Sequence, residues 1–159
     1  ETTSAQVLDP IQYTMASGSI LEYGCLGPCA CPVVYIGPVT GSFTFYRTRV
    51  DPLYTHYALV NIDWRYPVPS GTGGTPRLAH VRGSGTYAQG GEFALVQRMT
   101  LDLNTDDSLS QHFDSGFVPV QAPFPVIAID AKLQVNVCID SVFRVVAGPD
   151  CRRAGAGWR

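Results

Sequence analysis

The chain has 159 residues, of which 45% are apolar and 15% charged, and its formal net charge is −2. This length fits one domain with a sizeable core, and the apolar content excludes a disordered chain. The near-neutral charge excludes a basic field that would attract nucleic acid, and no apolar run reaches the roughly 18 residues of a membrane span. Because the charged share lies well below the usual share of about a quarter, we expect partners or other copies of the chain to cover part of the surface.

Short runs of alternating apolar and polar residues, separated by glycine and proline, predict β-strands along the whole chain. In chain order they are 7–15, 19–23, 33–36, 39–50, 54–66, 78–88, 92–103, 110–113, 126–137 and 138–147. No helical periodicity continues beyond a turn or two. The sequence therefore predicts an all-β fold, either an antiparallel β-sandwich or a partly open β-barrel of about eight or nine strands.

The same patterns predict how the chain is divided. Residues 1–18 are expected to form an extended N-terminal arm or an edge strand, 19–151 a single β-domain, and 152–159 a flexible basic tail. An extended arm ahead of a sheet can also add a strand to a neighbouring subunit.

Two strands carry more specific expectations. In 54–66, strict alternation would place Tyr54, Ile62 and Trp64 on one face of the sheet, and Asp63 on the other. The strand 78–88 contains two glycines, which predict either a β-bulge or another backbone passing close by.

Five cysteines are the chemically distinctive residues, and three of them lie in the loop 24–32. The disulfide candidates are Cys25, Cys29, Cys31, Cys138 and Cys151. Their spacing predicts a small local disulfide from Cys25 to Cys29 or Cys31. A second disulfide, between Cys138 and Cys151, would close a loop of about 14 residues, for roughly 3 kcal/mol of stabilisation. One thiol remains, which could join two subunits, and disulfides favour an oxidising compartment.

A metal site is the competing interpretation of the same loop. Cys25, Cys29 and Cys31 would bring three soft thiolates together, which suits copper or zinc. The ligand set is incomplete, because no second cysteine pair follows at zinc-finger spacing and the three histidines are scattered singly.

Calcium is a further alternative. Asp102, Asn104 and Asp106 have the spacing of the first three ligands of a calcium loop. The glycine and the glutamate expected later in such a loop are Asp107 and Phe113 instead, and a hairpin turn explains the same residues.

Aromatic residues on two neighbouring strands suggest a possible interaction surface, and ordinary cross-strand packing is the alternative. They are Tyr46, Tyr54, Tyr57, Trp64 and Tyr66. We expect no catalytic residues and no required cofactor, because no nucleophile elbow, phosphate loop or dinucleotide-binding motif is present.

Several short motifs resemble an uncharacterised class of secreted bacterial all-β domains. They are Cys25 with Cys29, Gly41-Ser42-Phe43-Thr44, Tyr57-Ala58-Leu59 with Ile62 and Trp64, Gly83-Ser84-Gly85-Thr86-Tyr87, Gly90-Gly91-Glu92-Phe93-Ala94, Gln97 and Leu101. The resemblance spans most of the middle of the chain and implies an extracellular all-β domain with no known activity. That class usually shows a simpler cysteine pair, so Cys31 is a departure.

The sequence thus predicts a secreted or cell-surface protein, extracellular or periplasmic, without nucleic-acid partners. The leading hypothesis is a structural or interaction domain that self-associates, or assembles with other surface proteins, as a layer, sheath or filament subunit. The alternatives are a metal-binding protein that uses the cysteine loop, and a carbohydrate- or surface-binding module.

Overall fold

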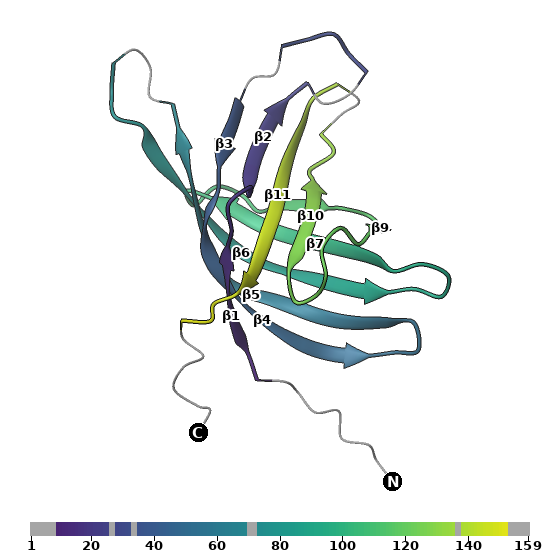
Figure 1. Cartoon of the computed structure of the whole chain (residues 1–159). Helices are drawn as coiled ribbons and strands as arrows, with labels where there is room; N and C mark the ends of the chain where they lie inside the picture. The colour runs from purple at the N-terminus through teal and green to yellow at the C-terminus, as the bar shows by residue number, and fades with distance from the viewer. Residues whose placement is uncertain (1–8, 26–27, 33–34, 70–72, 136–137, 153–159) are drawn as a thin grey trace.

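The computed structural model describes residues 9–25, 28–32, 35–69, 73–135 and 138–152, and these form eleven β-strands and no helix (Figure 1). The strands are β1 (Ile11–Met15), β2 (Ile20–Gly24), β3 (Tyr35–Pro38), β4 (Thr40–Val50), β5 (Tyr54–Val68), β6 (Arg77–Gly90), β7 (Val96–Thr105), β8 (Gln111–Asp114), β9 (Val118–Pro119), β10 (Ile127–Lys132) and β11 (Asp140–Pro149). The predicted all-β, antiparallel fold is confirmed.

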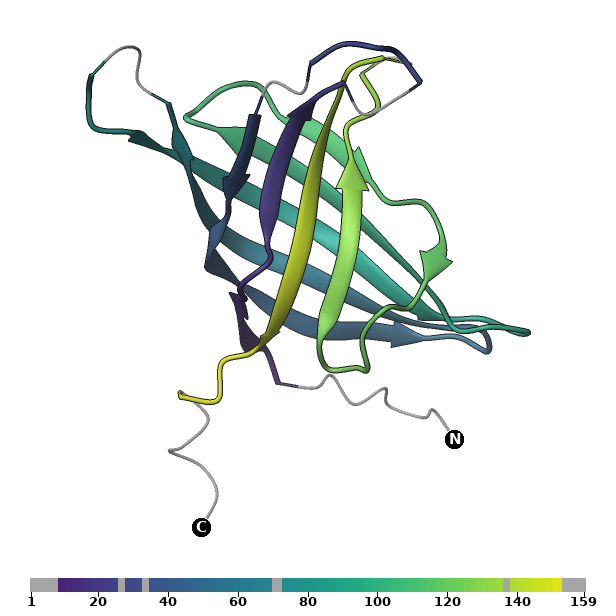
Figure 2. The ribbon, with the colours of Figure 1, turned by 45° about the horizontal axis from the view of Figure 1, so that its top comes forward.

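The strands form one sheet that curls back on itself, because β1 pairs with β4 on one side and with β11 on the other. The pairings follow the ring β1–β4–β5–β6–β7–β8–β10–β11, and β2 and β3 continue the sheet from β11. Only one residue pair, Lys132 with Asp114, joins β10 to β8. The fold is therefore a partly open barrel (Figure 2).

The strands β1 and β2 follow the same neighbouring strand, with a bend between them. β1 and β2 both pair with β11, and Ser19 lies in the bend between them. Its hydroxyl donates a hydrogen bond to the Val146 carbonyl at 2.8 Å and accepts one from the Val146 N–H at 3.1 Å. The segment 11–15, expected to be an arm or an edge strand, thus has a partner on both sides and belongs to the ring.

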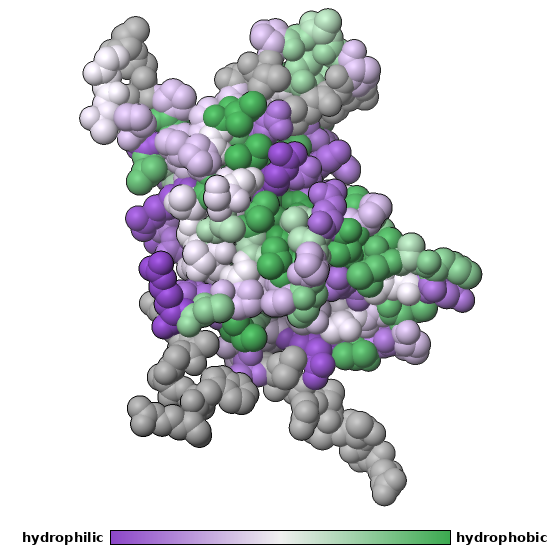
Figure 3. Space-filling model, viewed as in Figure 1, coloured by the Kyte–Doolittle hydropathy of each residue, from purple (hydrophilic) through white to green (hydrophobic). Residues whose placement is uncertain are grey.

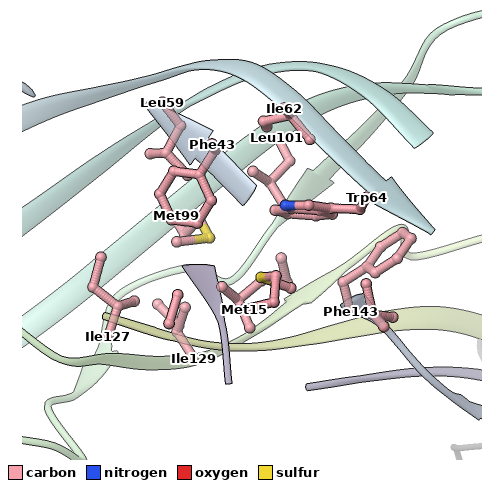
Figure 4. Close-up of a cluster of buried hydrophobic side chains, with 14 of the residues drawn as sticks. Met15, Phe43, Leu59, Ile62, Trp64, Met99, Leu101, Ile127, Ile129 and Phe143 are labelled. Atoms are coloured by element: carbon pink, nitrogen blue, oxygen red, sulfur yellow. The ribbon is translucent and has the colours of Figure 1, made fainter. Parts of the chain in front are cut away.

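The barrel interior is filled by side chains from nearly every strand. Trp64 lies 5.7 Å from Phe143, measured between ring centroids, and both rings pack near Met15 (Figure 4). Phe43 and Phe45 are buried, as the alternation in 39–50 predicts. The core is therefore packed rather than a channel.

The expected alternation in β5 is wrong in its first half. The buried residues Leu59 and Ile62 are three positions apart, because the register shifts between them and Asn61 has a φ of 52°. This bulge adds one residue and changes which face the side chains occupy. Tyr57 consequently packs against the core together with Trp64.

Antiparallel pairing places the connections at two ends of the barrel. One end, called the terminal end below, holds both ends of the described chain, the β4–β5 and β6–β7 turns, and the connection 115–126 (Figure 1). The opposite end, called the cysteine-loop end, holds the loop after β2 and the connections β5–β6, β7–β8 and β10–β11.

Candidate functional site

The terminal end is covered by the connection 115–126, called the strap below, which includes β9. Gln97 is buried on β7 and its side-chain amide donates to the carbonyls of Pro119 and Ala128, at 3.3 and 2.8 Å. The buried Tyr13 hydroxyl donates to the Pro125 carbonyl at 2.9 Å, and burial raises the pKa of Tyr13 to about 12. The strap is therefore fixed to the barrel by buried polar groups.

An apolar groove of about 600 Å³ lies between the strap and the two turns of this end. Its apolar lining comes from Leu53, Tyr54 and Tyr57 of the β4–β5 region, from Leu95, and from strap residues including Phe124. The rings of Phe124 and Tyr57 lie 5.5 Å apart, which fixes one wall of the groove. Such a groove is large enough for a side chain of a partner.

Exposed apolar side chains surround this groove. Phe93, in the β6–β7 turn, is 95% exposed and Leu95 is 58% exposed. Other large apolar residues exposed at this end include Val50, Leu53, Phe117, Phe124 and Val126. Hydrophobic residues gather on the side of the molecule where β9 and the β6–β7 turn lie (Figure 3). Exposed apolar side chains gathered at one end of a protein are typical of an interaction site.

Polar contacts hold the groove walls in place. Asp51 accepts hydrogen bonds from the Leu53 and Tyr54 N–H groups and lies 2.6 Å from the His56 ring. The hydrogen bond with His56, together with the backbone donors, lowers the pKa of Asp51 to about 2. The turn that carries Leu53 is thereby fixed by a carboxylate.

The strap's first aromatic residue is held by a cation. Arg98 forms a bidentate ion pair with Asp114, with two N–H···O hydrogen bonds of 3.0 and 2.6 Å. The Arg98 guanidinium also lies 5.4 Å from the centre of the Phe117 ring. This pairing lowers the pKa of Asp114. Phe117 is still 53% exposed, so its outer face is available to a partner.

A second, smaller feature lies at the cysteine-loop end. A crevice of about 230 Å³, called the tyrosine crevice below, opens between the β2–β3 pair and the end of β5. Its lining residues are Leu21, Tyr23, Tyr35, Tyr66, Val68, Pro69 and Ser141. Burial raises the pKa of Tyr35 and of Tyr66, so both phenols stay neutral.

The outer face of β5 to β8 is polar and contains two of the three histidines. His80 bonds Asp63 at 2.6 Å, and His112 bonds Asp102 at 2.7 Å. The described residues contain no group of three or more His, Cys, Asp or Glu side chains arranged to hold a metal ion.

One predicted disulfide, the local bond from Cys25 to Cys29 or Cys31, is confirmed, and the second predicted pairing is not. Cys25 is bonded to Cys31, and Cys29 to Cys138, while Cys151 is free and exposed. The predicted pair Cys138–Cys151 is wrong, because these residues flank the single extended strand β11. Ten extended residues span about 33 Å, far beyond disulfide reach.

The disulfides also bear on the metal interpretation of the loop. A sulfur atom in a disulfide is not a thiolate, so Cys25, Cys29 and Cys31 offer no thiolate ligands while the bonds are intact. Two disulfides are compatible with an extracellular or otherwise oxidising environment.

The residues considered for calcium have separate partners. Asp102 bonds His112, the Asn104 amide donates to the Ser108 carbonyl at 3.1 Å, and Asp106 lies 2.6 Å from Arg77. The pairing with Arg77 lowers the pKa of Asp106. The turn after β7 explains these residues without an ion.

The aromatic residues expected on one surface are distributed over four environments. Trp64 is fully buried, and its indole N–H has no hydrogen-bond partner among the described residues. Tyr54 and Tyr57 line the groove at the terminal end, Tyr66 lines the tyrosine crevice, and Tyr46 is partly exposed on β4.

The sequence does not identify Phe93 and Leu95 as surface residues. Their alternation with Met99 and Leu101 predicts a strand that begins at residue 92. β7 begins at Val96, so both side chains lie in the preceding turn. The doubled glycine at 90–91 is the available signal for a longer turn.

No helix suited in length and hydropathy to a membrane span occurs in the described part of the chain. Comparisons of the chain with protein-family models, with curated protein sequences and with solved structures find no match.

Proposed function

We propose that the protein is an extracellular interaction domain that self-associates through the apolar groove of the terminal end. The observation that supports this function is the presence of an exposed phenylalanine and an apolar groove on one surface. Phe93 is 95% exposed, and the groove beside it is lined by Leu53, Tyr57, Leu95 and Phe124.

A protruding side chain and a recess on the same surface suit a two-fold contact between copies. In such a contact each subunit places its Phe93 in the groove of the other, and the same residues are used twice. Removing one phenylalanine side chain from water contributes about 1.5–3 kcal/mol, so two symmetric insertions supply a substantial part of the binding free energy. The groove walls need little rearrangement, because Asp51 and Gln97 already hold the turn and the strap.

The amino-acid composition and the disulfides agree with this function. Only 15% of the residues are charged, so charge repulsion between copies is weak. The two disulfides suit a protein that works in an oxidising environment. A two-fold contact would be the first contact of a layer, sheath or filament on the cell surface.

Sedimentation velocity over a range of about 1–100 µM protein tests this function. We expect the dimer fraction to rise with concentration, and Phe93→Ser to abolish the rise. Leu109→Ser is the matched control, because Leu109 is 90% exposed but lies at the opposite end of the barrel. A monomer at every concentration, or a Phe93→Ser variant that dimerises like the wild type, would overturn the proposal.

A further inference from the structure

The tyrosine crevice exists because the barrel wall parts between β3 and β5. The β4–β5 ladder ends at the pair Thr40–Arg65. If this antiparallel ladder continued by two residues, it would pair Pro38 with Pro67. Neither proline has an N–H group, so neither can donate to the other strand. The remaining end of β5 pairs with β6 alone, and the opening persists.

Aromatic side chains line this opening instead of a ladder. The Tyr35 hydroxyl reaches across the gap and donates a hydrogen bond to the Pro67 carbonyl. Its ring lies over Gly37, where a Cβ atom would collide with the phenol. Tyr66 faces it from β5, with 6.2 Å between the ring centroids. Two prolines, a glycine and two tyrosines thus build a recess with flat walls.

The lining of the crevice indicates the kind of ligand that it fits. None of the lining side chains carries a charge, so a charged ligand would find no counter-charge there. The hydroxyls of Tyr23 and Ser141 have no hydrogen-bond partner among the described residues, and Tyr23 is 41% exposed. A ligand with a flat apolar face and an edge of hydroxyl groups matches both features.

We infer that the tyrosine crevice binds a single ring of a neutral carbohydrate, stacked against the tyrosines and hydrogen-bonded by the Tyr23 and Ser141 hydroxyls. The volume of about 230 Å³ lies below the range of drug-sized pockets, about 300–1,000 Å³, and fits one sugar ring at a chain end. A proline-rich peptide fits less well, because it docks along an extended aromatic groove rather than in one recess. The crevice and the apolar groove lie at opposite ends of the barrel, so both can be occupied together.

Titration of the full chain, followed by NMR, with glucose, N-acetylglucosamine and their β-1,4-linked trimers tests this site, with a decamer of proline as the competing probe. We expect saturable binding of at least one sugar, with a Kd of about 0.1–10 mM, and none of polyproline. Tyr23→Ala should weaken this binding about tenfold, since a lost stacking and hydrogen-bonding partner is worth about 1–2 kcal/mol. Gly37→Ala should weaken it similarly by moving the Tyr35 ring, whereas Tyr46→Ala on β4 should have no effect.

Two results would overturn the inference. One is the absence of saturable sugar binding, or a preference for polyproline. The other is sugar binding that survives both Tyr23→Ala and Gly37→Ala in variants whose NMR spectra show the native fold. Sedimentation of the same variants keeps this outcome separate from self-association, because neither substitution touches the terminal end.

Discussion

The buried hydroxyl of Tyr87 donates a hydrogen bond to the side-chain carbonyl of Gln97 at 3.0 Å. Gln97 in turn donates to two backbone carbonyls, one in the strap and one in β10. One buried amide therefore connects β6, β7, β10 and the strap, and it satisfies the buried Tyr87 hydroxyl. Burial also raises the pKa of Tyr87, so the phenol remains a donor.

We expect Gln97→Ala to lower the free energy of unfolding by about 2–4 kcal/mol, because it leaves the buried Tyr87 hydroxyl and two partly buried carbonyls without their partner. Urea unfolding measures this loss. Gln111→Ala is the matched control, because Gln111 is exposed on β8, and it should change stability by less than about 0.5 kcal/mol. Equal stabilities for the two variants would contradict the structural importance of Gln97.

The two disulfides should differ in their contribution to stability, because they close loops of very different length. Cys29 and Cys138 are 109 residues apart, whereas Cys25 and Cys31 are 6 apart. In the chain-entropy model these loops correspond to about 4–5 and about 2–3 kcal/mol. The double variant Cys29→Ser/Cys138→Ser should therefore unfold at a lower urea concentration than Cys25→Ser/Cys31→Ser.

The free Cys151 provides the control for that comparison. Cys151→Ser should unfold like the wild type, and alkylation of the native protein should modify one thiol per chain. A larger loss from the short loop would show that native-state contacts, rather than chain entropy, set the disulfide contributions.

The prediction of strands was successful where the register is unbroken, as in β10, where Ile127 and Ile129 are buried on one face. It failed in β5, because a single residue with positive φ, Asn61, inserts a bulge that no alternation pattern reveals. Sequence periodicity gives the side-chain face only while the register is unbroken. After this bulge is taken into account, Tyr57 lies on the inner face and packs against Phe45 with 4.6 Å between ring centroids.

The candidate site was less predictable than the fold, because it depends on contacts distant in sequence. The number of cysteines predicts two disulfides and one free thiol. Which cysteines pair depends on which strand ends lie together in the fold. The apolar groove requires the strap to cross beside the β4–β5 turn. The tyrosine crevice requires Pro38 and Pro67 to reach the same register position. Local patterns contain neither relationship.

Gly83 should be intolerant of a side chain, as the two glycines within the predicted strand 78–88 suggest. A Cβ atom there would collide with the Asp102 carbonyl of β7, and φ is 154°. We expect Gly83→Ala to cost about 2–4 kcal/mol of unfolding free energy. Gly148→Ala is the control, because its nearest neighbour would be a Val126 methyl group at 3.9 Å. Comparable chemical-denaturation midpoints for the two variants would exclude close approach as the reason for the glycine.

Stability in acid should depend on Asp51. Its pKa is lowered from 3.8 to about 2 in the folded protein, chiefly by the hydrogen bond with His56 and then by the Tyr54 and Leu53 N–H groups. A carboxyl whose pKa is lower in the folded state contributes stability above its unfolded pKa, and this contribution is lost as the pH falls through the folded value. Asp51→Asn should therefore melt a few degrees below the wild type at about pH 6, with the difference shrinking between about pH 4 and pH 2. Asp107→Asn, at an exposed turn position, is the matched control for the loss of one surface carboxylate. A gap between Asp51→Asn and the wild type that stays constant down to about pH 2 would mean that the ionised carboxylate is not what fixes the β4–β5 turn.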